Sequence, residues 1–239
     1  MGVKEPKKVS EMCIEGVQNR LNKMLEARKE YLENVDWNHV TLQKGNSKTG
    51  VSCWTVSLIP IVDCPNCAGC KRKCYDIRKD CIYPSVINDR ARNSAIHLAD
   101  PKRYWSEIAI QAKGLGVEQL RINVGGDLTD DDFGYIAGIA KLIPQCDILF
   151  FTKNYDGINK FLRENSFPSN VHPIISRWDG MDCCNEHNLP ESHVLWVDGK
   201  TTAPEFGSYY CSGNCSVCHF NKEGCWTLKN GESVIFSAH

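Results

Sequence analysis

Eight of the fourteen cysteines in this chain fall into two short groups. The first group has the spacing C-x2-C-x2-C-x3-C, and the second has the spacing C-x3-C-x2-C-x6-C. Thiols set this close together cannot all pack as apolar side chains or pair as disulfides without strain, so a metal or an iron–sulfur cluster is the simplest explanation. The predicted ligands are Cys64, Cys67, Cys70 and Cys74 in the first group, and Cys211, Cys215, Cys218 and Cys225 in the second.

The spacing of the first group is typical of [4Fe-4S] ligation. Three of its sulfurs can surround one corner of the cluster, and the fourth either completes the cage or points elsewhere. Four thiolates make a closed site for electron transfer or structure, whereas three leave one iron open to a substrate. The intervening Lys71, Arg72 and Lys73 would offset the negative charge of such a cluster, although a solvated loop or a phosphate contact explains them equally well.

The second group contains Gly213 and Gly224, and glycine allows the tight turns that wrapping a metal requires. This group could hold its own cluster, bind zinc, or lend a ligand to the first site. His219 offers a nitrogen donor, although a loop histidine more commonly faces solvent. Cys53 precedes the first group on a predicted strand, which makes it the best candidate for an additional ligand.

Composition excludes several classes of protein. The net charge is −1, so no strong field favours nucleic acid or an anionic membrane. No apolar run approaches the roughly 18 residues of a membrane span, and the first residues lack the apolar core of a signal peptide. A disulfide framework suits small secreted domains rather than a chain of 239 residues. We therefore expect a cytoplasmic protein with reduced thiols.

The hydrophobic pattern predicts an α/β fold. An amphipathic helix is expected over 10–35, with Ser10 as N-cap, followed by an exposed loop at 43–50. Short apolar strands that alternate with helices indicate a parallel sheet covered on both faces. The predicted strands are 51–62, 119–124, 147–152, 171–176, 193–197 and 233–236, and the later helices are about 87–98, 101–114, one capped by Thr129 that runs through Ala140, and 155–164.

Polar residues follow three of these strands at the point where each strand ends. In parallel sheets the carboxyl ends of the strands share one edge, where α/β folds place their chemistry. We therefore predict a ligand pocket at this rim, facing the first cysteine group. Its candidate residues are Gly125, Gly126 and Asp127 after the second strand, Lys153 and Asn154 after the third, and Ser176 and Arg177 after the fourth. Each position taken singly is also explained as a turn, a helix cap or a surface contact.

A cysteine loop after the first strand and Gly-Gly-acid after the second resemble the radical SAM superfamily. The resemblance implies a partial (β/α)6 TIM-like barrel, here with an N-terminal helix and loop (1–50) packed on a domain (51–239) that includes a cysteine-rich segment (205–230). It also implies one or two [4Fe-4S] clusters and S-adenosylmethionine (SAM). Gly125, Gly126 and Asp127 would match the segment that contacts the methionine amino group, with Asp in place of Glu, and Ser176 would match a ribose contact.

A closer resemblance, over most of the chain, is to the phage "gene product 88" type of uncharacterised proteins. It rests on Cys70 to Tyr75, on Arg121 to Asp127, on Thr152-Lys153, and on a C-terminal cysteine group that closes in Cys225-Trp226. It supports the fold and the cluster more than any activity, and a phage-encoded protein would act in the host cytoplasm.

Three hypotheses follow. The first is a radical-SAM-like enzyme that uses its cluster for one-electron chemistry on an unidentified small or macromolecular substrate. The second is an iron–sulfur protein without SAM, acting in electron transfer or redox sensing with an electron-donor protein. The third is a zinc-stabilised module whose basic cysteine loop contacts nucleic acid, which the net charge does not favour.

Overall fold

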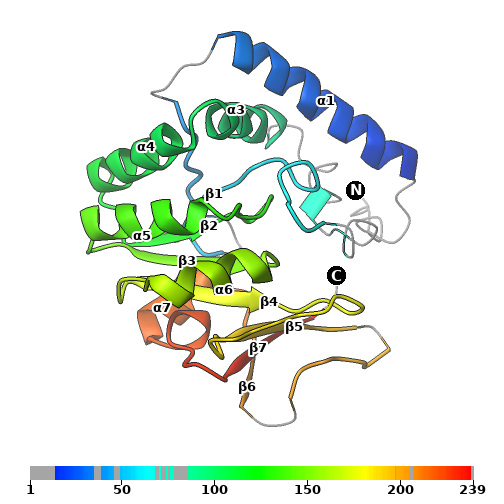
Figure 1. Cartoon of the computed structure of the whole chain (residues 1–239), viewed down its shortest axis with the longest axis vertical. Coiled ribbons are helices and arrows are strands. Elements are labelled where there is room, and N and C mark those ends of the chain that lie inside the picture. The colour runs from blue at the N-terminus through cyan, green and yellow to red at the C-terminus, as the bar shows by residue number, and fades with distance from the viewer. Residues whose placement is uncertain are drawn as a thin grey trace, which may run out of the picture.

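A sheet of seven parallel strands organises the computed structural model (Figure 1). The strand order is β1-β2-β3-β4-β5-β7-β6, so the first five strands are neighbours in the order in which they occur in the chain. The strands are β1 (Trp54–Val56), β2 (Gln119–Ile122), β3 (Asp147–Thr152), β4 (Val171–Ser176), β5 (Glu191–Leu195), β6 (Ser208–Tyr210) and β7 (Ser233–Ser237).

The structure describes residues 14–34, 39–45, 49–67, 70, 74, 76–77, 86–196, 198–204 and 207–237. Several predictions fall outside these ranges, among them the Ser10 cap and the basic residues Lys71, Arg72 and Lys73.

The predicted parallel α/β sheet is confirmed, and each of the six predicted strands is present, β3 and β4 with the predicted ends and the other four with shifted ends. β1 is much shorter than predicted because the chain leaves the sheet in a turn. In that turn, Asp63 accepts a hydrogen bond from the Ile59 amide at 2.8 Å, and Ile61 has a left-handed φ of 70°. β6 was not predicted. Within the described residues β1 and β6 lie at opposite edges without pairing, so the observed sheet is open.

The helices are α1 (Ile14–Glu33), α3 (Val86–Ala99), α4 (Pro101–Gly114), α5 (Asp132–Leu142), α6 (Tyr155–Glu164) and α7 (Cys215–Asn221), with a 3-10 turn, η3, at Gly224–Trp226. The prediction that Thr129 caps a helix is wrong, because α5 begins at Asp132. The Thr129 amide and hydroxyl instead both donate to the Asp132 carboxylate, at 2.8 and 2.9 Å.

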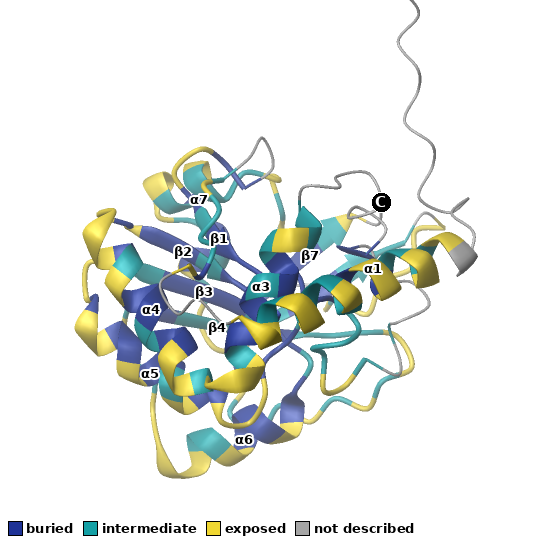
Figure 2. Cartoon of the chain, turned by 90° about the horizontal axis from the view of Figure 1, so that it is seen from above, coloured by how far each residue is buried: buried dark blue, intermediate teal, exposed yellow. Residues whose placement is uncertain are grey.

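Alternate residues of the strands point to two different cores. Leu120, Ile122 and Phe150 belong to the larger core, which they form with residues of α4, α5 and α6. Leu149 and Ile174 point to the other face, where they pack with Trp226 and Cys218. Figure 1 shows α5 and α7 on opposite sides of β3, and Figure 2 shows the strands as the buried layer beneath exposed helical turns. The C-terminal cysteine segment therefore packs on the face of β3 and β4 that is opposite α5.

The helix α1 packs across α3, outside the main layers. Arg28 on α1 donates to Asp63 and to Ser94, both at 3.2 Å, and so ties the helix to the start of the cysteine loop. None of the helices in the described ranges combines the length and the apolar character that a bilayer crossing requires.

Candidate functional site

The first cysteine group begins at the carboxyl edge of the sheet, where Asp63 fixes the chain. The Asp63 carbonyl accepts from the Asp127 amide at 2.9 Å, and its carboxylate accepts from Ile59 and Arg28. Asn66 reaches the next strand end, because its side-chain amide donates to the Lys153 carbonyl at 3.3 Å. These contacts connect the loop to the ends of β2 and β3, as the sequence predicted for the rim.

The thiols of this group are partly buried and influence one another. Burial raises the pKa of Cys64, and the nearby Asp127 carboxylate raises it further. Burial also raises the pKa of Cys70, an effect that the charge of Lys153 opposes. Cys74 likewise has a raised pKa because of burial, although hydrogen bonding to the Ile77 backbone opposes the rise. Such thiols stay protonated until a cation replaces their protons.

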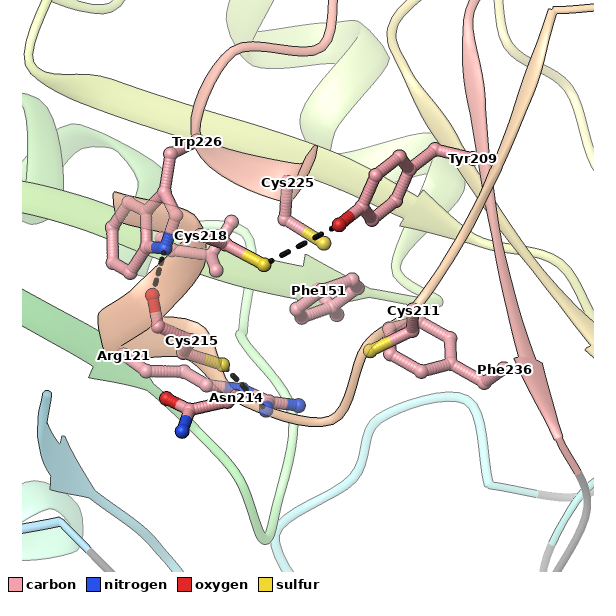
Figure 3. Close-up of a pocket in the computed structure, with 11 residues that line it drawn as sticks. Arg121, Phe151, Tyr209, Cys211, Asn214, Cys215, Cys218, Cys225, Trp226 and Phe236 are labelled. Atoms are coloured by element: carbon pink, nitrogen blue, oxygen red, sulfur yellow. Dashed lines mark hydrogen bonds between the residues drawn. The ribbon is translucent and has the colours of Figure 1, made fainter. Parts of the chain in front are cut away.

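The second cysteine group lines one pocket on the face of the sheet opposite α4 and α5. Figure 3 shows the sulfurs of Cys211, Cys215, Cys218 and Cys225 pointing into the same space. The walls come from distant parts of the chain and comprise Arg121, Leu149, Phe151, Tyr209, Asn214, Trp226 and Phe236. All four cysteines of the second group thus lie at one pocket, and whether they bind their own metal stays a prediction.

Polar donors surround three of the four sulfurs. The Gly213 amide donates to Cys211 Sγ at 3.4 Å, and Arg121 Nη1 donates to Cys215 Sγ at 3.8 Å. The Ser212 and Tyr209 hydroxyls lie 3.2 and 3.6 Å from Cys218 Sγ. Hydrogen bonds to sulfur stabilise thiolates and tune the metals that they bind.

Arg121 of β2 lines this pocket, and Cys53, directly before β1, contacts one of its sulfurs, that of Cys215. Sequence reasoning assigned neither residue to the second cysteine group. The Arg121 guanidinium lies 4.9 Å from the centre of the Phe151 ring, a cation–π distance. A hydrogen bond from Cys53 and the charge of Arg121 lower the pKa of Cys215 to about 6, against the effect of burial. Cys53 thus lies at the second group, although its position in the sequence suggested the first.

His219 has a structural partner. Its Nε2 lies 2.7 Å from Asp147 Oδ2, which fastens α7 to the start of β3. Among the described residues, no group of three or more His, Cys, Asp or Glu side chains is arranged to hold a metal ion. Metal binding by either cysteine group therefore stays a prediction.

The rim residues are placed together but are largely engaged with one another. Asp127 is buried, and its carboxylate accepts from Leu128 N at 2.8 Å, Thr152 Oγ1 at 2.8 Å and Lys153 N at 2.9 Å. Burial raises the pKa of Asp127. The charge of Lys153 and these hydrogen bonds act against that rise. Lys153 Nζ donates to Ser176 Oγ at 3.0 Å and lies 5.4 Å from the Trp178 ring centre.

Asn154 and Arg177 also have structural roles. Asn154 caps α6 by accepting from the Gly157 amide at 3.1 Å, and its side-chain amide donates to the Leu128 carbonyl at 3.1 Å. Arg177 forms an ion pair with Glu191 through two hydrogen bonds, of 2.8 and 3.0 Å. A contact of either residue with a ligand stays a prediction.

The two glycines of the rim are required by close protein contacts. A Cβ on Gly125 would overlap the ion pair between Asp76 and Arg90, whose side chains are only 6 and 9 % exposed. A Cβ on Gly126, which has a φ of 82°, would lie 2.7 Å from Leu58 Cβ. The Gly125 amide donates to Ser57 Oγ at 3.2 Å, and its carbonyl accepts from the Leu58 amide at 2.9 Å. Packing thus explains why these positions lack side chains.

Asn123, directly after β2, is a rim residue that sequence reasoning missed. Its side chain is only 7 % exposed, yet neither Nδ2 nor Oδ1 has a hydrogen-bond partner in the described chain. Its φ of 50° is left-handed, which costs a non-glycine residue energy, though Asn less than most. Each buried polar group left unpaired costs about 1–3 kcal/mol. The only signal in the sequence was a polar Asn near the end of the predicted strand 119–124, just before a Gly-Gly turn.

Residues 22–206 match the family model described as Gene product 88. The match begins within α1, includes the first cysteine group and the rim, and ends before the second cysteine group. No curated protein and no solved structure gives a significant match. None of these findings supports the resemblance to radical SAM enzymes.

Proposed function

We propose that this chain, which belongs to the Gene product 88 family, is an iron–sulfur protein with two thiolate centres. The first centre would be a [4Fe-4S] cluster on Cys64, Cys67, Cys70 and Cys74 at the carboxyl edge of the sheet. The second would be a cluster, or alternatively zinc, on the four C-terminal cysteines. The observation that carries this proposal is the C-terminal pocket, where N–H or O–H groups surround three of four convergent sulfurs.

The chain's own residues would prepare both centres. Arg121 brings a positive charge to the second pocket, where four thiolates would otherwise repel one another. Lys153 likewise brings a positive charge close to Cys70 in the first centre. The partial burial of the first loop would limit the access of water to the metal. A [4Fe-4S] cluster supplies one-electron chemistry when it is bound.

A finer proposal is that the first centre works with SAM in a partial barrel of radical SAM type. Support comes from the sequential order of β1 to β5 and from the position of the cysteine loop after the first strand. Gly125 and Asp127 fit this proposal less well, because their polar groups are already hydrogen-bonded within the protein. Lys153 and Ser176 would be the remaining predicted contacts at the rim.

Metal analysis tests the proposal directly. Protein purified without oxygen should be brown and should contain iron and acid-labile sulfide in equal amounts. Replacement of Cys64, Cys67 and Cys70 by Ala should remove one cluster's share of iron. The same change at Cys211, Cys215 and Cys218 should remove a second share of iron, or all of the zinc.

A matched control replaces Cys183 and Cys184 by Ala, because they lie in neither group. This variant should keep the full metal content. Colourless wild-type protein that contains zinc alone would favour the zinc module, and protein free of both metals would refute the proposal. If iron is present but SAM alters neither the EPR signal of the reduced protein nor the yield of 5′-deoxyadenosine, electron transfer or sensing with a donor protein becomes the better function.

A further inference from the structure

The thiol of Cys53 belongs to neither proposed centre, yet it lies against the second one. Its side chain is 0 % exposed and packs in the same small core as Cys218, Cys215 and Cys225. A hydrogen bond joins its sulfur to that of Cys215. Two thiols in contact, from positions far apart in the chain, are the arrangement from which a disulfide forms.

Backbone contacts hold the two cysteines in this position. Ser216 follows Cys215 and accepts at Oγ from the Cys53 amide at 3.0 Å. The Ser216 amide in turn donates to the Thr49 carbonyl at 3.0 Å. Trp226 Nε1 donates to the Cys215 carbonyl, also at 3.0 Å (Figure 3). The start of α7 is thus fastened to the segment before β1, so protein contacts alone keep the two sulfurs together.

The other sulfurs of the pocket have different neighbours. Cys218 Sγ lies 3.2 Å from the Ser212 hydroxyl, and Cys211 Sγ accepts from a backbone amide at 3.4 Å. Access from outside also differs between the members of the pair, because Cys215 lines the pocket and is partly exposed, whereas Cys53 is fully buried. A small oxidant that enters the pocket therefore reaches Cys215, and the thiol waiting behind that sulfur is Cys53.

We propose that Cys53 and Cys215 form a reversible disulfide when the second centre meets a peroxide, and that this bond releases the metal of that centre. The proposal rests on the proposed function and adds a redox control to its second site. The Cys215 sulfur attacks hydrogen peroxide, so an S–O bond forms, the O–O bond breaks, and the hydroxide that leaves takes up a proton to give water. The Cys53 sulfur then attacks the oxidised sulfur, so the S–S bond forms, the S–O bond breaks, and the Cys53 proton leaves in a second water. Counted from two thiols, one peroxide gives one disulfide and two waters.

This bond removes one of the four predicted ligands of the second centre. Metals bind cysteine as thiolate, and a disulfide sulfur carries no charge. Three thiolates would remain around the metal, which a chelator would then remove. Reduction of the bond returns both thiols, so the site can be filled again. Loss of the metal would thereby report the oxidant, in keeping with the sensing form of the proposed function.

Peptide mapping of the whole chain tests the assignment. Protein purified without oxygen is treated with limiting hydrogen peroxide in the presence of a chelator, alkylated with iodoacetamide and digested without reduction. Mass spectrometry should find the Cys53 peptide joined to the Cys215 peptide, and dithiothreitol should separate them. Metal-bound thiolates resist alkylation, so the partly exposed Cys211 and Cys225 should become alkylated only after peroxide has acted.

Cys53→Ala should lose the joined peptide, and its Cys215 should advance to sulfinic acid, which dithiothreitol does not reverse. Cys146→Ala is the matched control, because Cys146 is also 0 % exposed but lies outside both groups, and this variant should keep the joined peptide. The assignment is overturned if oxidised wild-type protein joins Cys215 to any cysteine other than Cys53, or if Cys53 stays a free thiol. It is equally overturned if the bond forms while Cys211 stays protected.

The wild-type map decides the pairing even if Cys53→Ala does not fold. Metal content before oxidation is measured on the same preparation. Protein isolated without iron or zinc would refute the proposed function, whereas metal-loaded protein without the joined peptide would refute only the disulfide.

Discussion

Replacement of Gly125 by Ala separates a packing role of this glycine from a ligand role. The new Cβ would overlap atoms of both Arg90 and Asp76, which are joined by two hydrogen bonds, the longer of them 3.0 Å. Neither side chain can swing into water easily, since they are 9 and 6 % exposed. The structure therefore predicts that the ion pair must break or that the strand end must shift.

The size of the effect follows from these two alternatives. Overpacking a buried site costs about 1–3 kcal/mol, and separating a buried ion pair costs about 3–5 kcal/mol. A shift of the backbone would relieve the overlap and leave part of the attraction between Arg90 and Asp76 intact. The cost of overpacking and the cost of separating the ion pair therefore do not add. We expect Gly125→Ala to lower the free energy of unfolding by about 3–5 kcal/mol, equivalent to roughly 6–20 °C in melting temperature for a chain of this size.

Urea unfolding followed by circular dichroism, at matched metal content, measures this change. Gly138→Ala is the matched control, because Gly138 is exposed in the middle of α5 and an added Cβ would meet nothing within 4 Å. That change should stabilise the protein by about 0.5–1 kcal/mol. A wild-type unfolding midpoint for Gly125→Ala would refute the packing argument and would return this position to a role in ligand binding.

Three further substitutions test the contacts that hold the site in place. Arg28→Met should cost about 1–3 kcal/mol because it leaves the largely buried Asp63 carboxylate without its counter-charge, and an unchanged urea midpoint would contradict this. Asp132→Asn should lower the free energy of unfolding by about 2–4 kcal/mol, because the buried carboxylate accepts hydrogen bonds from His97 at 2.8 Å and from Trp105 at 2.7 Å. Thermal melts of the variant and the wild type measure this change. Burial opposes the ionisation of Glu191, but the nearby His193 imidazole, 3.4 Å away, and hydrogen bonds from Arg177 lower its pKa from 4.5 to about 2. The stabilisation that this carboxylate provides is therefore complete above pH 4.5 and lost as the pH falls towards 2. Glu191→Gln should be less stable than wild type at pH 7 and equally stable near pH 2, and a pH-independent difference in melting temperature would argue against the assignment.

The sequence alone was sufficient for features set by local pattern. Runs such as 147–152 and 171–176 match β3 and β4 residue for residue, because a buried strand is read from its own apolar side chains. The rim was also predictable, since the ends of neighbouring parallel strands must meet at one edge. β6 was missed because its three residues carry too little pattern to distinguish a strand from a loop.

Tertiary structure decided which distant residues meet. The second cysteine group could be recognised from its spacing, but only the folded sheet brings Arg121 and Cys53 to it, from more than ninety residues earlier in the chain. The same holds for the ion pair that covers Gly125 and for the unpaired amide of Asn123. The physical reason is that spacing reports neighbours along the backbone, whereas burial and hydrogen bonding depend on what the fold places across the sheet.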